Sequence, residues 1–195
     1  MRKFSLFYLL AVMLLASGCE SEMLDQEVKK PVIKEGQTSI SITGDGMVST
    51  RSTSGRVEFT GGYATGAGLY AGDAYATVEA VPYDGYQLVN FAGGPIGGNT
   101  NQFSGRNQYE FNIESQDWQF SVSFKKEYAI SVSAGSGGSV SGGGTILEDE
   151  SCTVNASANS GYSFEGWYEG STKVSSSANY TFTVSSNRTI RFFLT

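Results

Sequence analysis

Apolar and polar residues alternate with a period of two along most of the chain beyond residue 37. The alternation is clearest in four stretches near the end, "AISVSA" (129–134), "SCTVNAS" (151–157), "NYTFTVS" (179–185) and "RTIRFFL" (188–194). A period of two predicts β-strands, and each of these has one apolar side, as two small sheets packed around one core require. No apolar residues recur at helical spacing after the first twenty positions, so we predict an all-β globular region.

The chain also repeats itself. The stretch "GLYAGDAYATVEAVPYDGYQLVNFAGG" (68–94) aligns without a gap with "GTILEDESCTVNASANSGYSFEGWYEG" (144–170), at a constant offset of 76. Farther along, "YEFNIESQDWQFSVSF" (109–124) resembles "YTFTVSSNRTIRFFL" (180–194). Self-similarity at this spacing indicates repeated structural units. We therefore predict two modules, an elaborated copy at 38–126 and a plainer copy at 127–195.

The stretch "GYSFEGWYEG" (161–170) concentrates aromatic residues that could form either a ligand platform or a core. Strict alternation places Tyr162 and Phe164 on one face, and a β-bulge at Glu165 and Gly166 would return Trp167 to the same face. The first copy has leucine where the second has Phe164. Because leucine has no π face but packs well in a core, we predict that these three rings are core residues.

The motifs "YAISVSAGSGGSVSGGG", "GYSFEGWYEG" and "YTFTVSSNRTIRFFL" together resemble the divergent internalin-B-type B repeat, also called the bacterial Listeria–Bacteroides repeat. The resemblance covers 128–195 closely and 38–126 more weakly, because the first copy has inserts and lacks the tryptophan. It implies extracellular all-β or β-grasp-like modules of surface proteins, used for adhesion or as spacers, and it brings no catalytic residues. The expected fold is thus two tandem small β-sandwich or β-grasp-like modules after a lipoprotein signal and a flexible tether.

The first nineteen residues, "MRKFSLFYLLAVMLLASGC", have two basic residues, an apolar run and small residues before Cys19. This order is typical of a secretory signal, and "LASGC" resembles a bacterial lipobox. We predict a lipoprotein signal peptide at 1–18, acylation of Cys19, and a flexible tether at 19–37. The alternative is an ordinary signal peptide with an incidental cysteine.

Acidic residues follow Cys19 in "ESEMLDQE", which resembles the export tag of Bacteroidetes-type surface lipoproteins but would also suit a solvated tether. Loss of the signal removes two basic residues and leaves 11 basic against 19 acidic residues, a net charge of −8. This charge argues against nucleic acid as a partner and against a second, electrostatic attachment to lipid. We expect the outer membrane, reached through the N-terminal lipid alone, with the modules facing the extracellular side.

The sequence offers little for catalysis. It contains no histidine and no glycine-rich phosphate loop with a lysine, so we expect no enzyme activity and no cofactor. Three contiguous acids, Glu148 to Glu150, would point to alternate faces of a strand, and neither they nor Asp45 show the spacing of a calcium loop, so we predict no metal site. Cys152 alternates with Val154 and is predicted to be a small core residue.

Two inserts distinguish the first copy, at 49–67 and 95–107. Long loops on a rigid β scaffold often bind ligands, and these loops bring polar and aromatic side chains. The candidate ligand-binding residues are Tyr63, Asn99, Asn101, Phe103 and Arg106, with Phe103 expected to stack and Arg106 to donate charge-assisted hydrogen bonds. The alternative is a self-packed hairpin, "RVEFTGGYAT", that merely fills a gap. The predicted function is non-catalytic adhesion or spacing at the cell surface, with a host protein as a possible partner; the alternative is glycan binding.

Overall fold

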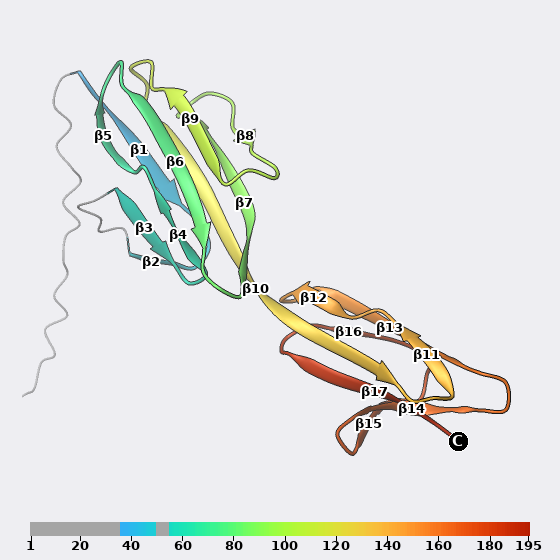
Figure 1. Ribbon diagram of the computed structural model, residues 1–195. Helices are drawn as coiled ribbons and strands as arrows, with labels where there is room; N and C mark the ends of the chain where they lie inside the picture. The colour runs from blue at the N-terminus through green and yellow to red at the C-terminus, as the bar shows by residue number, and fades with distance from the viewer. Residues whose placement is uncertain (1–35, 50–54) are drawn as a thin grey trace, which may run out of the picture. The chain divides into compact units, whose positions relative to one another are not determined.

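The computed structural model describes residues 36–49 and 55–195. Within these ranges the chain forms seventeen β-strands and no helix (Figure 1). In this part of the chain, accordingly, no helix is long and apolar enough to cross a membrane. The prediction of an all-β fold is confirmed.

The first module is a sandwich of two sheets. One sheet has the order β5–β1–β10–β7–β8, with β1 (Gln37–Thr43), β5 (Gly68–Ala71), β7 (Tyr86–Pro95), β8 (Asn101–Gln102) and the first half of β10 (Trp118–Ala134). The other has the order β2–β3–β4–β6–β9, with β2 (Met47–Ser49), β3 (Arg56–Phe59), β4 (Gly62–Thr65), β6 (Tyr75–Pro82) and β9 (Gln108–Asn112). Both sheets direct apolar side chains into one core: Ile40, Ile42, Val57, Phe59, Ala64, Ala76, Val78, Ala80, Phe91, Phe103, Phe111, Ile113, Phe120 and Val122.

The second module is built in the same way around its own core. One sheet contains the second half of β10 with β12 (Gly144–Leu147), β14 (Phe164–Glu169), β15 (Thr172–Ser175) and β17 (Arg188–Leu194). The other contains β11 (Gly138–Ser141), β13 (Ser151–Ala158) and β16 (Asn179–Thr183). The buried residues are Ile130, Cys152, Val154, Trp167, Val184, Ile190 and Phe192, so the predicted core position of Cys152 is confirmed.

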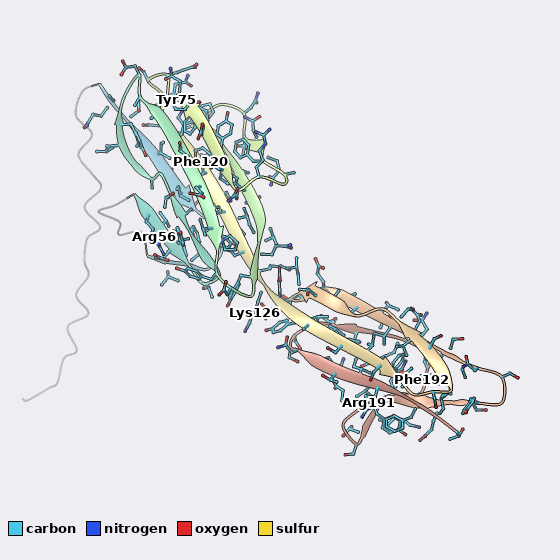
Figure 2. All side chains as sticks on the ribbon, in the orientation of Figure 1. Arg56, Tyr75, Phe120, Lys126, Arg191 and Phe192 are labelled. Atoms are coloured by element: carbon cyan, nitrogen blue, oxygen red, sulfur yellow. The ribbon has the colours of Figure 1, made fainter. Side chains whose placement is uncertain are left out.

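Strand β10 belongs to both modules (Figure 2). It pairs with β7 up to Lys126, and from Glu127 onward it pairs with β12. At the change of partner, the Glu127 N–H donates to the Gly85 carbonyl at 2.8 Å, and the Glu148 N–H donates to the Lys126 carbonyl at 2.8 Å. The chain therefore passes from one core to the next within a hydrogen-bonded strand.

The two modules share strand register as well as sequence. Ile40 of β1 lies opposite Gly68 of β5, and Ile130 of β10 lies opposite Gly144 of β12. The offset of 76 that aligns the sequences maps Gly68 onto Gly144. In each module the first strand also runs parallel to the last, β1 beside β10 and β10 beside β17. The repeat in the sequence is thus a repeat in the fold.

One pair of glycines explains part of the repeated pattern. Gly66 and Gly142 occupy equivalent positions and have positive φ values of 99° and 94°. A Cβ at Gly66 would lie 2.2 Å from the carbonyl oxygen of Thr77, and one at Gly142 would lie 2.2 Å from that of Thr153. Both positions need glycine for its backbone freedom and for the close approach of the next strand.

The predicted bulge is present in both modules. Phe164 pairs with Leu194 and Gly166 pairs with Phe193, which leaves Glu165 as the extra residue. In the first module, Leu88 pairs with Phe124 and Asn90 with Ser123, so Val89 is the extra residue although no glycine follows it. The bulge turns Trp167 inward, where its side chain is fully buried, and the prediction for Trp167 is confirmed.

The expected core position of Tyr162 is wrong. Tyr162 is 50% exposed, because β14 begins only at Phe164 and the alternation does not extend back to it. Phe164 is half-buried and packs against the core. In the insert at 49–67, residues 56–65 form the β3–β4 hairpin with Val57 and Phe59 buried, which is the self-packed hairpin that the sequence offered beside a ligand-binding loop. Its apolar residues pack as core because β3 and β4 extend the second sheet.

Candidate functional site

A groove of about 550 Å³ lies beside β7 in the first module. It is lined by residues 86–91 of β7, by residues 102–107 and by Pro82 at the end of β6. Residues 103–107 cross from one sheet to the other, because β8 belongs to the first sheet and the Asn107 carbonyl accepts a hydrogen bond from the Ala80 N–H of β6. The groove is therefore at the edge of the sandwich, where residues 103–107 and the turn from Pro82 to Tyr86 both connect the two sheets.

Phe103, predicted to stack on a ligand, is a core residue instead. Its side chain is 8% exposed, and the centre of its ring lies 4.2 Å from the ring centre of Tyr109 and 5.1 Å from that of Phe91. These contacts anchor the segment that forms one wall of the groove. Phe103 thus shapes the groove but has no open ring face to offer a ligand.

Arg106 lies in the wall of the groove with an exposed side chain. Its backbone N–H donates to the Phe103 carbonyl at 3.1 Å, which closes a tight turn at residues 103–106. Of the residues that line the groove, Arg106 alone carries a charge. Within residues 36–49 and 55–195, no carboxylate lies within ion-pair distance of its guanidinium group. Arg106 is available to bind an anion from outside.

Asn99, Asn101 and Tyr63 do not line this groove. Asn99 and Asn101 are exposed and belong to the β7–β8 hairpin, where Asn101 pairs with Gly93. Tyr63 lies on β4, in the other sheet of the module. The structure therefore unites Phe103 and Arg106 of the five candidates, and their role in binding stays a prediction.

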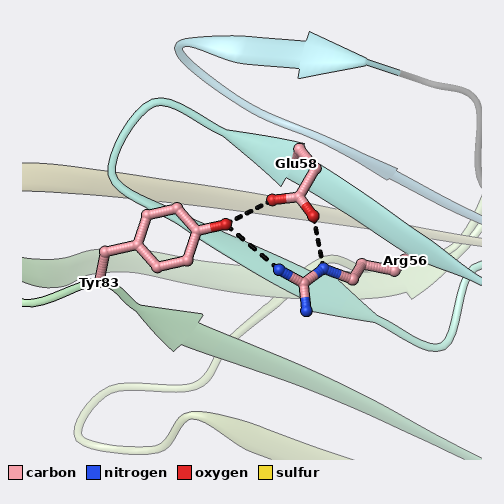
Figure 3. A network of polar contacts seen from close by, with 3 residues as sticks. All are labelled: Arg56, Glu58 and Tyr83. Carbon is pink, nitrogen blue, oxygen red and sulfur yellow. Dashed lines mark hydrogen bonds and ion pairs between the residues drawn. The ribbon is translucent and has the colours of Figure 1, made fainter.

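Tyr63 instead belongs to a polar network on β3 and β4 (Figure 3). The Arg56 guanidinium lies 3.5 Å from the centre of the Tyr63 ring and donates to Glu58 and, at 3.2 Å, to the Tyr83 hydroxyl. The Tyr83 hydroxyl in turn donates to Glu58 at 2.6 Å. Hydrogen bonding from Arg56 and then from Tyr83 lowers the pKa of the Glu58 carboxyl, whereas the bond to Glu58 raises the pKa of Tyr83. One face of Tyr63 is covered by this network.

The second module has a smaller groove of about 340 Å³, at the ends of β10 and β17. Tyr162, Arg191 and Phe193 line it, and Tyr162 and Phe193 are 50% and 42% exposed. Our sequence analysis missed this surface. The alternation in "RTIRFFL" was the available signal, because it places Arg191 and Phe193 on the side away from Ile190 and Phe192.

A bidentate ion pair fixes the other side of the second module. Arg188 donates to the two carboxylate oxygens of Glu169 at 2.8 and 2.9 Å, and its guanidinium carbon lies 4.1 Å from the centre of the Phe182 ring. Hydrogen bonding from Arg188 lowers the pKa of the Glu169 carboxyl, against the opposing effect of burial. The same bond raises the pKa of Arg188. This pair joins β14 to β17 and is a structural contact.

The acidic turn has structural contacts as well. The Tyr128 hydroxyl donates to Glu148 at 3.2 Å, and the Val184 carbonyl accepts a bond from the Asp149 N–H. Among the residues that the structure describes, no three His, Cys, Asp or Glu side chains form a cluster that could hold a metal ion.

A family comparison agrees with the repeated register. The model of the divergent InlB B-repeat domain matches residues 39–126 and again residues 128–191. This chain belongs to the divergent InlB B-repeat family. A search of the curated proteins finds no match to it.

The larger groove lies where the first B-repeat departs from the second. The chain between β8 and β9 spans residues 103–107 in the first B-repeat, and the chain between β15 and β16 spans only 176–178 in the second. In the second B-repeat, the Trp167 indole N–H donates to the Ala178 carbonyl of that short segment at 3.2 Å. The first B-repeat has Phe91 at this position, which has no such donor.

Proposed function

We propose that this protein is a non-catalytic binding protein of the cell surface, tethered by lipid on Cys19, and that the groove beside β7 is its ligand site. The observation that carries the proposal is the groove itself, with Arg106, which has no ion-pair partner among the described residues, in a wall anchored by the buried Phe103. A volume of about 550 Å³ is within the usual range of ligand pockets, about 300–1,000 Å³. Cys19 lies outside the described residues, so the tether rests on the signal sequence alone.

Host matrix proteins and glycans are the two ligand classes to screen. The test is to apply the full chain to a glycan array and to immobilised matrix proteins, in parallel with Arg106→Gln. We expect binding that Arg106→Gln weakens, because the substitution removes the one charged side chain among the described residues that line the groove. Arg191→Gln is the matched control, since Arg191 is an exposed arginine in the groove of the other B-repeat.

A spacer without a ligand is the second candidate function. It is favoured by β10, which continues from one core to the next and leaves no loop between them. No binding at all would favour the spacer, whereas binding that Arg106→Gln and Arg191→Gln leave unchanged would place the ligand outside both grooves.

A further inference from the structure

One edge of β7 is open along the groove. β10 pairs with β7 on one side from Tyr86 to Pro95. On the other side β8 pairs with Ala92 and Gly93 only. Within the described part of the chain, no strand pairs with residues 86–90 on that side. The same residues line the groove, so the open edge and the groove are one feature.

Two hydrogen bonds show which backbone groups face outward. Gly85 faces β10, because its carbonyl accepts from Glu127, and Phe91 faces away, because its carbonyl accepts from Phe103. In an antiparallel ladder, a residue directs its N–H and C=O to the same side, and neighbours alternate. Counting from Gly85, Leu88 faces away from β10. The bulge at Val89 explains why Phe91, three residues later, faces the same way.

The open edge matches an extended peptide better than a sugar. Leu88 presents both a donor and an acceptor to the groove, which is the pairing that a further strand requires. Sugars are commonly held by stacking on aromatic faces, and the rings here are already packed. Phe103 is buried, and the Tyr86 ring lies over Gly61, where an added Cβ would be 2.4 Å from it. The groove therefore offers the backbone groups of Leu88, with the side-chain amides of Gln87 and Asn107 beside them, rather than an open aromatic face.

Arg106 adds a charge requirement. It alone among the lining residues is charged, and it has no carboxylate partner in the described part of the protein. An incoming carboxylate would form a charge-assisted, bidentate contact with its guanidinium group. We propose that the groove binds an extended, carboxylate-bearing peptide, which adds to β7 as a new edge strand through Leu88 and is held by Arg106. This inference rests on the proposed function, because it names the ligand class of the same groove.

The test begins with a phage-displayed library of linear peptides, selected against the full chain. We expect peptides that contain Asp or Glu, and we expect Arg106→Gln to weaken them about tenfold or more, as loss of a hydrogen bond to a charged group does. Arg191→Gln should leave their affinity unchanged. A selected peptide is then synthesised with single backbone N-methyl groups. Methylation should abolish binding at the position whose N–H donates to the Leu88 carbonyl and be tolerated at the two neighbouring positions, whose N–H groups face away from β7.

Three results would overturn the inference. N-methyl sensitivity without alternation would mean that the peptide does not bind as a strand. In the second case no peptide is selected, but a glycan binds and Arg106→Gln weakens that binding. The ligand class would then be a glycan and not a peptide, and the proposed function would stand. If the peptide selection, the glycan array and the matrix-protein screen all detect no binding, both the inference and the proposed function are rejected.

Discussion

Trp167 and Phe91 occupy equivalent positions and fill their cores differently. Trp167 is the largest fully buried side chain in the described part of the protein, and its indole N–H is satisfied by Ala178. Phe91 is smaller, and its ring packs 5.1 Å from that of Phe103. Two phenylalanines in the first B-repeat thus occupy a region of the core that one tryptophan fills in the second.

The first prediction concerns Trp167→Ala. We expect the second B-repeat to lose about 3–5 kcal/mol of unfolding free energy, because the substitution leaves a large cavity and removes the hydrogen bond from the indole to Ala178. Such a loss approaches the whole stability of a small domain. Denaturant unfolding of the full chain measures it. Phe193→Ala, at a residue 42% exposed, is the control and should cost about 1 kcal/mol or less. An unchanged midpoint for Trp167→Ala would contradict the core assignment.

The second prediction concerns pH. The pKa of Glu169 is lowered by hydrogen bonding from Arg188, so the folded state holds this carboxylate charged more strongly than the unfolded state does. Its contribution to stability is present above the unfolded pKa and is lost as pH falls through the folded pKa. Glu169→Gln should therefore lower the melting temperature near neutral pH, and the difference from wild type should shrink at about pH 3, below the ordinary carboxyl pKa.

Glu150→Gln is the control for this pH experiment, because Glu150 is an exposed acid in the same B-repeat. It should change the melting temperature little at either pH. A Glu169→Gln effect that persists undiminished in acid would show that the ion pair with Arg188 is not its source.

At the level of strands, much of the fold follows from alternation and repetition. Ile190 and Phe192 are buried as the pattern in "RTIRFFL" predicts, and the bulge needed by Trp167 is present. Alternation predicts burial only within a strand. Tyr162 was wrongly placed in the core because β14 begins two residues later, at Phe164. Alternation succeeded at β3, where the pattern of Val57 and Phe59 pointed to the self-packed hairpin that the structure contains.

The groove could be predicted only in part. Phe103 and Arg106 were identified from the insert that contains them, but sequence spacing could not show that Phe103 turns inward onto Tyr109. The open edge of β7 depends on where β8 stops pairing, which is a property of the hairpin and of no single residue. The position of the Phe103 ring and the open edge of β7 both depend on how strands pair in three dimensions, which residue spacing alone does not show.

The third prediction tests a glycine shared by the repeats. Gly142→Ala should destabilise the second B-repeat, because a Cβ would lie 2.2 Å from the Thr153 carbonyl oxygen and φ is positive. Gly161→Ala separates the two causes. Gly161 also has a positive φ, 86°, but has nothing within 4 Å of its Cβ position. We expect Gly142→Ala to lower the melting temperature more than Gly161→Ala does, and equal effects would contradict the steric explanation.

For the molecule as a whole, attachment to the membrane is the fourth prediction. Cys19→Ser removes the thiol that would be acylated, and we expect it to move the protein from the membrane pellet to the soluble fraction. Cys152→Ser is the matched control, since Cys152 is buried within the second B-repeat and its loss should leave fractionation unchanged. Recovery of Cys19→Ser in the pellet at the wild-type level would rule out a lipid anchor at Cys19.

Parallel pairing of the first and last strands has a mechanical consequence. In the second B-repeat, residues 130–134 of β10 lie beside residues 188–192 of β17. A force on the two ends of this module slides the strands past each other and loads all of their hydrogen bonds together. Tension applied instead through Ser131→Cys and Thr189→Cys, at one end of the pair, would break the bonds one after another. Force spectroscopy should therefore find a higher rupture force along the chain than across these two handles.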